Sequence, residues 1–252
     1  MDSRFFQIFL DWYLLAIDLL LVVGIIYFLK LTKQQKSNIF FWLPFLILVF
    51  TVFYENLGGY TIYNFEFNQW VNEYLGNVDN PRYNVWIFNF SYKQIATILY
   101  LFLIKYWLDA FKKKYINWMV VFFIVIILVI QLSGLEPIYL NQPIIFALGA
   151  NMILVGSGLY FISLITNEQY LNSNPLRLLS FWQMTFILFT YSLTYINSVA
   201  IGYLWNVNKQ LAMSLYQIDR TMGIINLSIL VLIIASPYLT RILEKEPSYG
   251  SS

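Results

Sequence analysis

The chain contains no cysteine and no histidine. Without cysteine it can form neither disulfides nor thiolate metal sites, and it has no cysteine nucleophile. Without histidine it cannot build histidine-ligated haem, a histidine zinc site or an imidazole general base. Rhomboid-type serine proteases, membrane acyltransferases and seven-helix zinc hydrolases all use histidine. We therefore expect a protein that is not an enzyme, with no catalytic residue, metal or cofactor.

A lysine is also missing from the last apolar segment, which runs from Thr221 to Thr240. Retinal proteins hold their chromophore as a Schiff base on a lysine of the seventh helix, so this class is excluded. Intramembrane aspartyl proteases place paired aspartates next to glycine, and neither Asp11 nor Asp18 has that setting. The sequence contains no motif that identifies a family.

Charge is scarce as well, because only 11% of the residues are charged whereas 60% are hydrophobic. In soluble domains about a quarter of all residues are charged, so we expect this chain to be surrounded by lipid and not by water. The net charge of +2 is not concentrated in a basic face, which argues against nucleic acid as a partner. Abundant Asn, Lys, Ile, Phe and Tyr suggest an AT-rich bacterial genome, and hence a multi-pass protein of the inner membrane.

Seven long apolar stretches fill most of the chain, and each is long enough to cross a bilayer as a helix. The third is the weakest because Lys93 and Lys105 interrupt it. The first should remain as a span, since Lys33 and Lys36 follow it whereas only Arg4 precedes it. We predict an all-α fold: a single domain over 1–240 with seven transmembrane helices, and a short disordered tail over 241–252. The predicted spans are 10–30, 39–58, 91–110, 116–134, 143–165, 177–201 and 219–239.

Basic residues predict the orientation of these helices. The loops on one side hold ten lysines and arginines and those on the other side hold five, with Lys112–Lys114 in a very short loop of the richer side. Because short cytoplasmic loops are enriched in basic residues, we expect the N-terminus outside and the C-terminus in the cytoplasm.

The outer connection 59–90 is longer than the others and rich in aromatic residues, which flexible linkers lack. Helical spacing of its apolar residues predicts a short interfacial helix over Phe67–Leu75, ended by Gly76 and followed by a turn at Asn80-Pro81. It could anchor the protein in the membrane surface or cover a pocket.

Several polar side chains fall within the predicted spans, in their outer halves. At the rise of an α-helix, Asp18 lies about 18 Å from the inner boundary of its span. The same count places the other polar residues about 18–30 Å from the inner boundaries of their own spans. These residues are Glu55, Lys93, Asn151, Asn197, Asp219, Arg220 and Asn226. Gln7 and Asp11 share the helix face of Asp18, and this face must point into the bundle because lipid cannot solvate it. Since an unpaired buried carboxylate is costly, Asp18 should keep a proton or meet a cation. For Asp219-Arg220 itself, at the membrane border, a surface pair is the simpler expectation. The predicted ligand-binding residues are Asp18, Glu55, Asn56, Lys93, Asn197 and Arg220.

The inner halves of the spans carry few polar residues, so no line of acids crosses the bilayer. This asymmetry favours a pocket that opens to one side. The sequence therefore predicts a bacterial sensor or receptor-like module that binds a small polar ligand from outside and signals through a separate protein partner. Two alternatives stay open: a transporter or channel with Asp18 and Glu55 as coupling groups, and a structural subunit of a larger membrane complex, where polar residues only pack helices.

Overall fold

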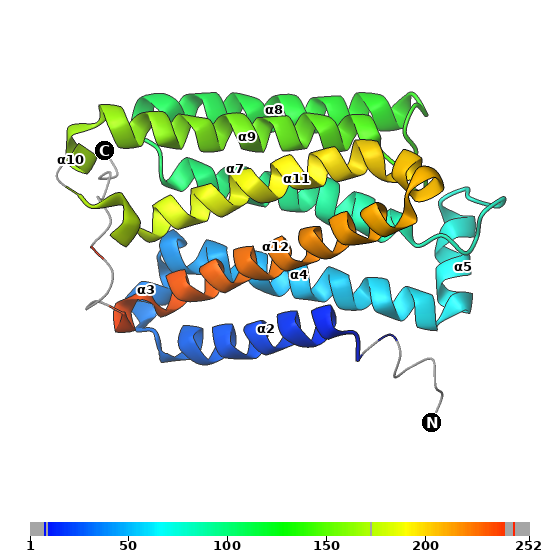
Figure 1. Cartoon of the computed structure of the whole chain (residues 1–252), viewed down its shortest axis with the longest axis horizontal. Helices are drawn as coiled ribbons and strands as arrows, with labels where there is room; N and C mark the ends of the chain where they lie inside the picture. Colours follow the sequence, from blue (N-terminus) through cyan, green and yellow to red (C-terminus); the bar gives the residue numbers. More distant parts are fainter. Residues whose placement is uncertain (1–7, 9, 172, 240–243, 245–252) are drawn as a thin grey trace.

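The computed structural model of the chain describes residues 8, 10–171, 173–239 and 244, without the side chains of 169, 171, 197–199, 201 and 202. Within these residues every regular element is a helix, which confirms the all-α prediction. The long helices lie side by side along the longest axis of the molecule (Figure 1). Of the predicted tail 241–252, only residue 244 belongs to the described part.

In the described part of the chain, six helical segments are long and apolar enough to cross a membrane. The third of them is continuous but composite, made of α6, the π-helix η1 and α7. The segments are α2 (Trp12–Lys30), α4 (Ile39–Tyr63), α6–η1–α7 (Val85–Phe88, Asn89–Ala96 and Thr97–Tyr106), α8 (Ala110–Leu132), α9 (Pro143–Thr166) and α12 (Lys209–Ala235) together with η3 (Ser236–Tyr238).

The predicted sixth span corresponds to α11 (Leu179–Val207), a helix of 29 residues. It is not among the six candidate spans. Seven transmembrane helices therefore remain a prediction, whereas the helical character of all seven segments is confirmed.

Helix boundaries differ from the predicted ones mainly at one end of the bundle. The helix α4 continues to Tyr63 and α12 begins at Lys209, well before the predicted residue 219. Asn208 fixes this start, because its side chain accepts a hydrogen bond from the backbone N–H of Leu211 at 3.1 Å. Polar composition at a helix end predicts a loop, but the cap at Asn208 lets α12 begin before its polar first turns.

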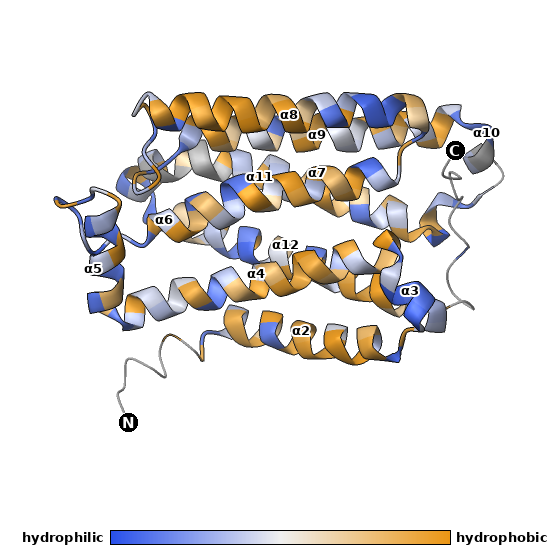
Figure 2. Ribbon diagram, turned by 180° about the vertical axis from the view of Figure 1, so that it is seen from behind, coloured by the Kyte–Doolittle hydropathy of each residue, from blue (hydrophilic) through white to orange (hydrophobic). Residues whose placement is uncertain are grey.

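The packing order runs from α2 at one edge to α8 at the other. The helix α2 contacts α4 and α12, α12 contacts α11, and α8 packs on α7 and α9. Small residues let α9 approach its neighbours: a Cβ on Gly149 would lie 3.0 Å from Thr97 Cγ2, and one on Gly156 would lie 3.2 Å from Ile116 Cδ1. Figure 2 shows apolar residues along the helices and polar residues gathered toward the two ends.

The two ends of the bundle carry different short elements. One end, called the α5 end below, holds α5 (Phe65–Tyr74) and the starts of α2 and α12. The opposite end, called the α3 end, holds α3 (Lys33–Ser37), α10 (Glu168–Leu171), η2 (Pro175–Arg177) and η3 (Ser236–Tyr238).

The helix α5 is the short helix predicted in the loop 59–90. Its capping residue Leu75 is followed by Gly76, whose φ of 88° is open to glycine at little cost. Buried Asn72 donates to the carbonyl oxygen of Tyr83 at 2.8 Å, so the returning chain is tied to the helix. The connection is therefore a packed element, with Trp70 63% exposed on its outer face.

Candidate ligand-binding cavity

A cavity of about 660 Å³ lies among α2, α4, α6–η1–α7, α11 and α12, toward the α5 end. This volume falls within the usual range for small-molecule sites. The lining residues Ile62 and Tyr216 are 60% and 48% exposed, whereas Tyr191 and Leu227 are each 2% exposed. The cavity thus has an opening near Ile62 and Tyr216 and a closed end near Tyr191 and Leu227.

Glycines leave part of this space open. Gly223 of α12 lines the cavity, and a Cβ built on it would have Tyr13 Oη as its nearest neighbour, at 3.5 Å. Such a distance is ordinary contact, so the position tolerates a small side chain. A larger one there would extend into the cavity.

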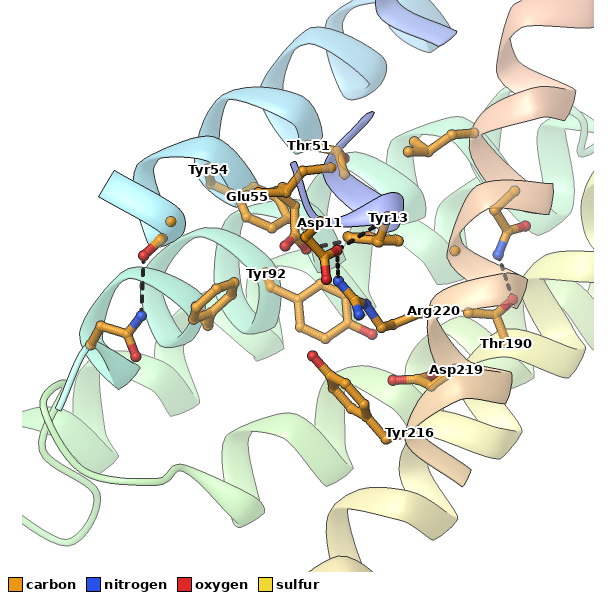
Figure 3. Close-up of a pocket in the computed structure, with 18 of the residues that line it drawn as sticks. Asp11, Tyr13, Thr51, Tyr54, Glu55, Tyr92, Thr190, Tyr216, Asp219 and Arg220 are labelled. Atoms are coloured by element: carbon orange, nitrogen blue, oxygen red, sulfur yellow. Dashed lines mark hydrogen bonds and ion pairs between the residues drawn. The ribbon is translucent and has the colours of Figure 1, made fainter. Parts of the chain in front are cut away.

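An ion pair joins the first and last of the described long helices at the opening. The guanidinium of Arg220 on α12 donates to the carboxylate of Asp11, which precedes α2 (Figure 3). The same Asp11 oxygen caps α2 by accepting the N–H of Tyr13 at 2.9 Å. Arg220 also lies over three aromatic rings, with its Cζ 4.7 Å from the centroid of Tyr13, 5.2 Å from Trp12 and 5.3 Å from Tyr216. The expected Asp219–Arg220 surface pair is thus replaced by a pair across helices.

Two further carboxylates line the cavity. Glu55 of α4 accepts a hydrogen bond from Tyr13 Oη at 3.4 Å. Asp219 of α12 accepts one from the hydroxyl of Thr194 on α11. With Asp11 and Arg220, the described lining therefore holds three carboxylates and one cationic side chain. Their formal charges sum to −2.

Tyrosine is the commonest side chain in the lining. Six tyrosines reach the cavity from five long helices, with Tyr92 and Tyr100 both on the continuous segment α6–η1–α7. The rings of Tyr100 and Tyr191 meet edge to face with centroids 5.7 Å apart, and those of Tyr54 and Tyr92 lie 6.4 Å apart. The buried hydroxyl of Tyr191 has no hydrogen-bond partner among the described residues. The lining tyrosines are Tyr13, Tyr54, Tyr92, Tyr100, Tyr191 and Tyr216.

Apolar packing closes the cavity toward the α3 end. At the closed end, Asn226 Nδ2 donates to Thr190 Oγ1 at 2.5 Å. One and two turns further along α12, Leu230 and Ile234 are 1% and 0% exposed within the main apolar core. The polar lining therefore does not continue through the bundle among the described residues, as the asymmetry of the sequence predicts.

The π-helix η1 separates this cavity from a second polar region. Tyr92 faces the cavity, whereas other side chains of η1 bond to the 136–142 connection before α9. Gln94 Nε2 donates to Gln142 Oε1 at 2.9 Å, and Asn89 Nδ2 donates to the carbonyl oxygen of Ile138 at 2.7 Å. π-Helical turns occur frequently at functional sites, and here the turn serves both regions.

The structure brings only part of the predicted site together. Glu55 and Arg220 line the cavity. Asp18 accepts a hydrogen bond from Asn56 Nδ2 at 2.8 Å, and the two residues form a pair between α2 and α4 that is outside the cavity lining. Among the described residues Asp18 thus meets an amide and no cation, whereas the alternative prediction, that Asp18 keeps a proton, stays a prediction.

Lys93 and Asn197 have separate outcomes. The ammonium of Lys93 donates to Asn141 Oδ1 at 2.7 Å and so belongs to the polar region between η1 and the 136–142 connection. The side chain of Asn197 lies outside the described residues.

Sequence reasoning missed most of the residues that line the cavity. Asp11 shares a helix face with Asp18, but the depth count favoured Asp18. The tyrosines gave a usable signal, because tyrosines that recur inside long apolar segments need partners for their hydroxyls. No residue of α5 is among the described lining residues, which favours a surface anchor over a lid.

Comparison of the chain with protein-family models, with curated proteins and with solved structures finds no match.

Proposed function

We propose that the protein is a sensor or receptor-like module of a bacterial inner membrane, which binds a small polar ligand in this cavity. In this proposal α11 completes a bundle of seven transmembrane helices. The N-terminus and the α5 end face outward, and the α3 end faces the cytoplasm, in agreement with the positive-inside rule. The ligand would enter from outside through the opening beside Asp11 and Arg220.

The observation that carries this proposal is a one-sided cavity with ionisable side chains in its lining. Charged residues at membrane depth are costly, and they commonly mark binding sites or transport paths. Here the charges stand around about 660 Å³ of space and the core beyond Asn226 is apolar. A closed end of this kind supports binding more than passage.

A ligand in this cavity would touch helices that are far apart in the chain. Its contacts could favour one arrangement of α2 and α12 relative to α4 and α11, which is how differential affinity shifts a conformational equilibrium. We propose that a separate protein partner reads this arrangement at the α3 end. The basic triplet Lys112–Lys114 and the 166–176 connection are the contact surfaces that we propose there.

Thermal unfolding of the detergent-solubilised chain, measured against a library of small polar molecules, tests the proposal. A ligand that binds only the folded state raises Tm in a concentration-dependent manner. The substitution Gly223→Leu should fill the cavity and abolish this shift. Gly158→Leu is the matched control, because Gly158 is also a helical glycine and has nothing within 4 Å of a built Cβ.

Three results would overturn the proposal. Equal ligand shifts in both leucine variants would place the ligand elsewhere. Flux of the ligand across liposomes would show a transporter. A chain that binds no small molecule and co-purifies in a fixed complex would be a structural subunit.

A further inference from the structure

We propose that the ligand of this cavity is a small organic cation, an amine or a quaternary ammonium compound with a second, hydrogen-bonding polar group. This inference rests on the proposed function, because it names the chemical class of the ligand that the cavity would bind. Three observations support it independently. They are the charge of the lining, the contacts that the Arg220 guanidinium already makes with aromatic rings, and one hydroxyl without a described partner at the closed end.

The charge of the lining selects for a cation. Among the described lining residues, Asp11, Glu55 and Asp219 are acidic and Arg220 is the only basic one. Arg220 already donates to Asp11. An anionic ligand would have to approach a site with an excess of carboxylates, whereas a cation would reduce this excess.

The aromatic rings of the lining are suited to hold such a cation. Arg220 shows this within the protein, since its guanidinium lies over the rings of two lining residues, Tyr13 and Tyr216, and over Trp12, which is outside the lining. Tyr54, which is only 3% exposed, and Tyr92 also line the cavity, with their ring centroids 6.4 Å apart, and Figure 3 draws both with Glu55. Tyrosine faces attract ammonium groups through the ring quadrupole, and several faces around one space are the usual way in which proteins bind quaternary ammonium.

The hydroxyl of Tyr191 indicates the second group of the ligand. Tyr191 is 2% exposed, lines the cavity, and has no hydrogen-bond partner among the described residues. A buried hydroxyl without a partner is unfavourable. A hydroxyl or carbonyl oxygen of the ligand would satisfy it while the ammonium group stays beside Glu55 and Tyr92.

Choline and its neutral analogue 3,3-dimethylbutan-1-ol form a matched pair of probes, because they differ mainly in the charge at one atom. Isothermal titration of the full chain in detergent should show choline binding at least about tenfold more tightly, as cation–π and ionic contacts of this size predict. Acetate and glycine betaine serve as the anionic and zwitterionic probes in the same series.

Variants locate the cation within the cavity. Glu55→Gln should weaken choline binding about tenfold and leave the neutral alcohol unaffected. Tyr92→Phe keeps the aromatic face and should retain choline binding, whereas Tyr92→Leu should lose it. Asp18→Asn is the control, because Asp18 lies outside the lining and an asparagine still accepts from Asn56.

The outcomes separate this inference from the proposed function. Equal affinity for choline and the neutral alcohol, or binding of acetate alone, would overturn the cation assignment and leave a ligand-binding cavity. The absence of binding by every probe class at millimolar concentration, together with no Tm shift by any member of the library, would overturn both.

Discussion

The two ends of the bundle use the same helices in different ways. Toward the α3 end, buried polar side chains meet directly: Trp107 Nε1 donates to Gln183 Oε1 at 2.6 Å, and Tyr160 Oη lies 2.7 Å from Ser180 Oγ. Toward the α5 end, polar side chains from α2, α4, α11 and α12 surround a cavity.

Under the proposed function, this difference lets one helical bundle combine rigid packing at one end with a binding site at the other. Polar pairs at the α3 end hold helices together, as interhelical hydrogen bonds commonly do in membranes. At the α5 end polar side chains also bond to one another across helices, but they do so around the cavity, where the hydroxyl of Tyr191 has no partner among the described residues. The role of a polar residue in an apolar helix therefore depends on whether its side chain faces a bonding partner or a cavity.

The largest effect on stability should come from introducing an asparagine into α12, either at the closed end of the cavity or in the apolar core beyond it. Leu227 and Ile234 lie two turns apart on one face of α12, but Leu227 lines the cavity and Ile234 is in the apolar core. We expect Ile234→Asn to lower the free energy of unfolding by about 3–5 kcal/mol, and Leu227→Asn by about half of that, because its amide can reach polar groups. Denaturant unfolding in mixed micelles measures both. Equal losses would mean that the closed end is no boundary.

A second pair of substitutions compares a paired group with an unpaired one. Trp107→Phe removes the donor to Gln183 and should cost about 1–3 kcal/mol, since the amide oxygen is left buried without it. Tyr191→Phe removes a hydroxyl without a described partner and should change stability by less than about 0.5 kcal/mol. A loss in Tyr191→Phe as large as that in Trp107→Phe would reveal a structural bond at the cavity.

The ion pair at the opening should contribute less than a buried pair. The side chains of Arg220 and Asp11 remain 16% and 30% exposed. Arg220→Gln should therefore cost about 1–2 kcal/mol, and the ionic part of this loss should shrink as salt rises. Thermal unfolding at low and high ionic strength checks it. A loss that does not depend on salt would assign the effect to ring packing alone.

The smallest effect should come from Asp18→Asn. The variant keeps an oxygen that accepts from Asn56 Nδ2, so stability should change by less than about 0.5 kcal/mol. The Tm shift produced by a cavity ligand should stay the same. A lost shift would extend the binding site beyond the described lining and restore Asp18 to the position that the sequence suggested.

The sequence predicted the helices better than the site. Apolar length alone locates each long helix, and Gly76 marks the end of α5, because these signals are local. The site depends on which way each side chain faces around its helix. Depth along the axis puts Asp18 and Lys93 in the outer halves of their spans together with Glu55, but their side chains bond to Asn56 and Asn141.

Helix length explains the remaining misses. The prediction started the last span at residue 219 and so placed Arg220 at its border. Because α12 begins at Lys209, Arg220 lies three turns inside a continuous helix and reaches across to Asp11. Asn208 carries the capping signal for this longer helix, but capping alone does not reveal which helix will lie opposite.

Asp11 accepts two hydrogen bonds with one carboxylate oxygen, and this has a practical consequence for the design of variants. One oxygen both starts α2 and holds Arg220, so the folding of the first helical turn and the charge at the opening change together. Asparagine at this position would preserve the helix start and remove the charge, whereas alanine would remove both. The difference between these two replacements separates the local backbone contribution from the electrostatic one.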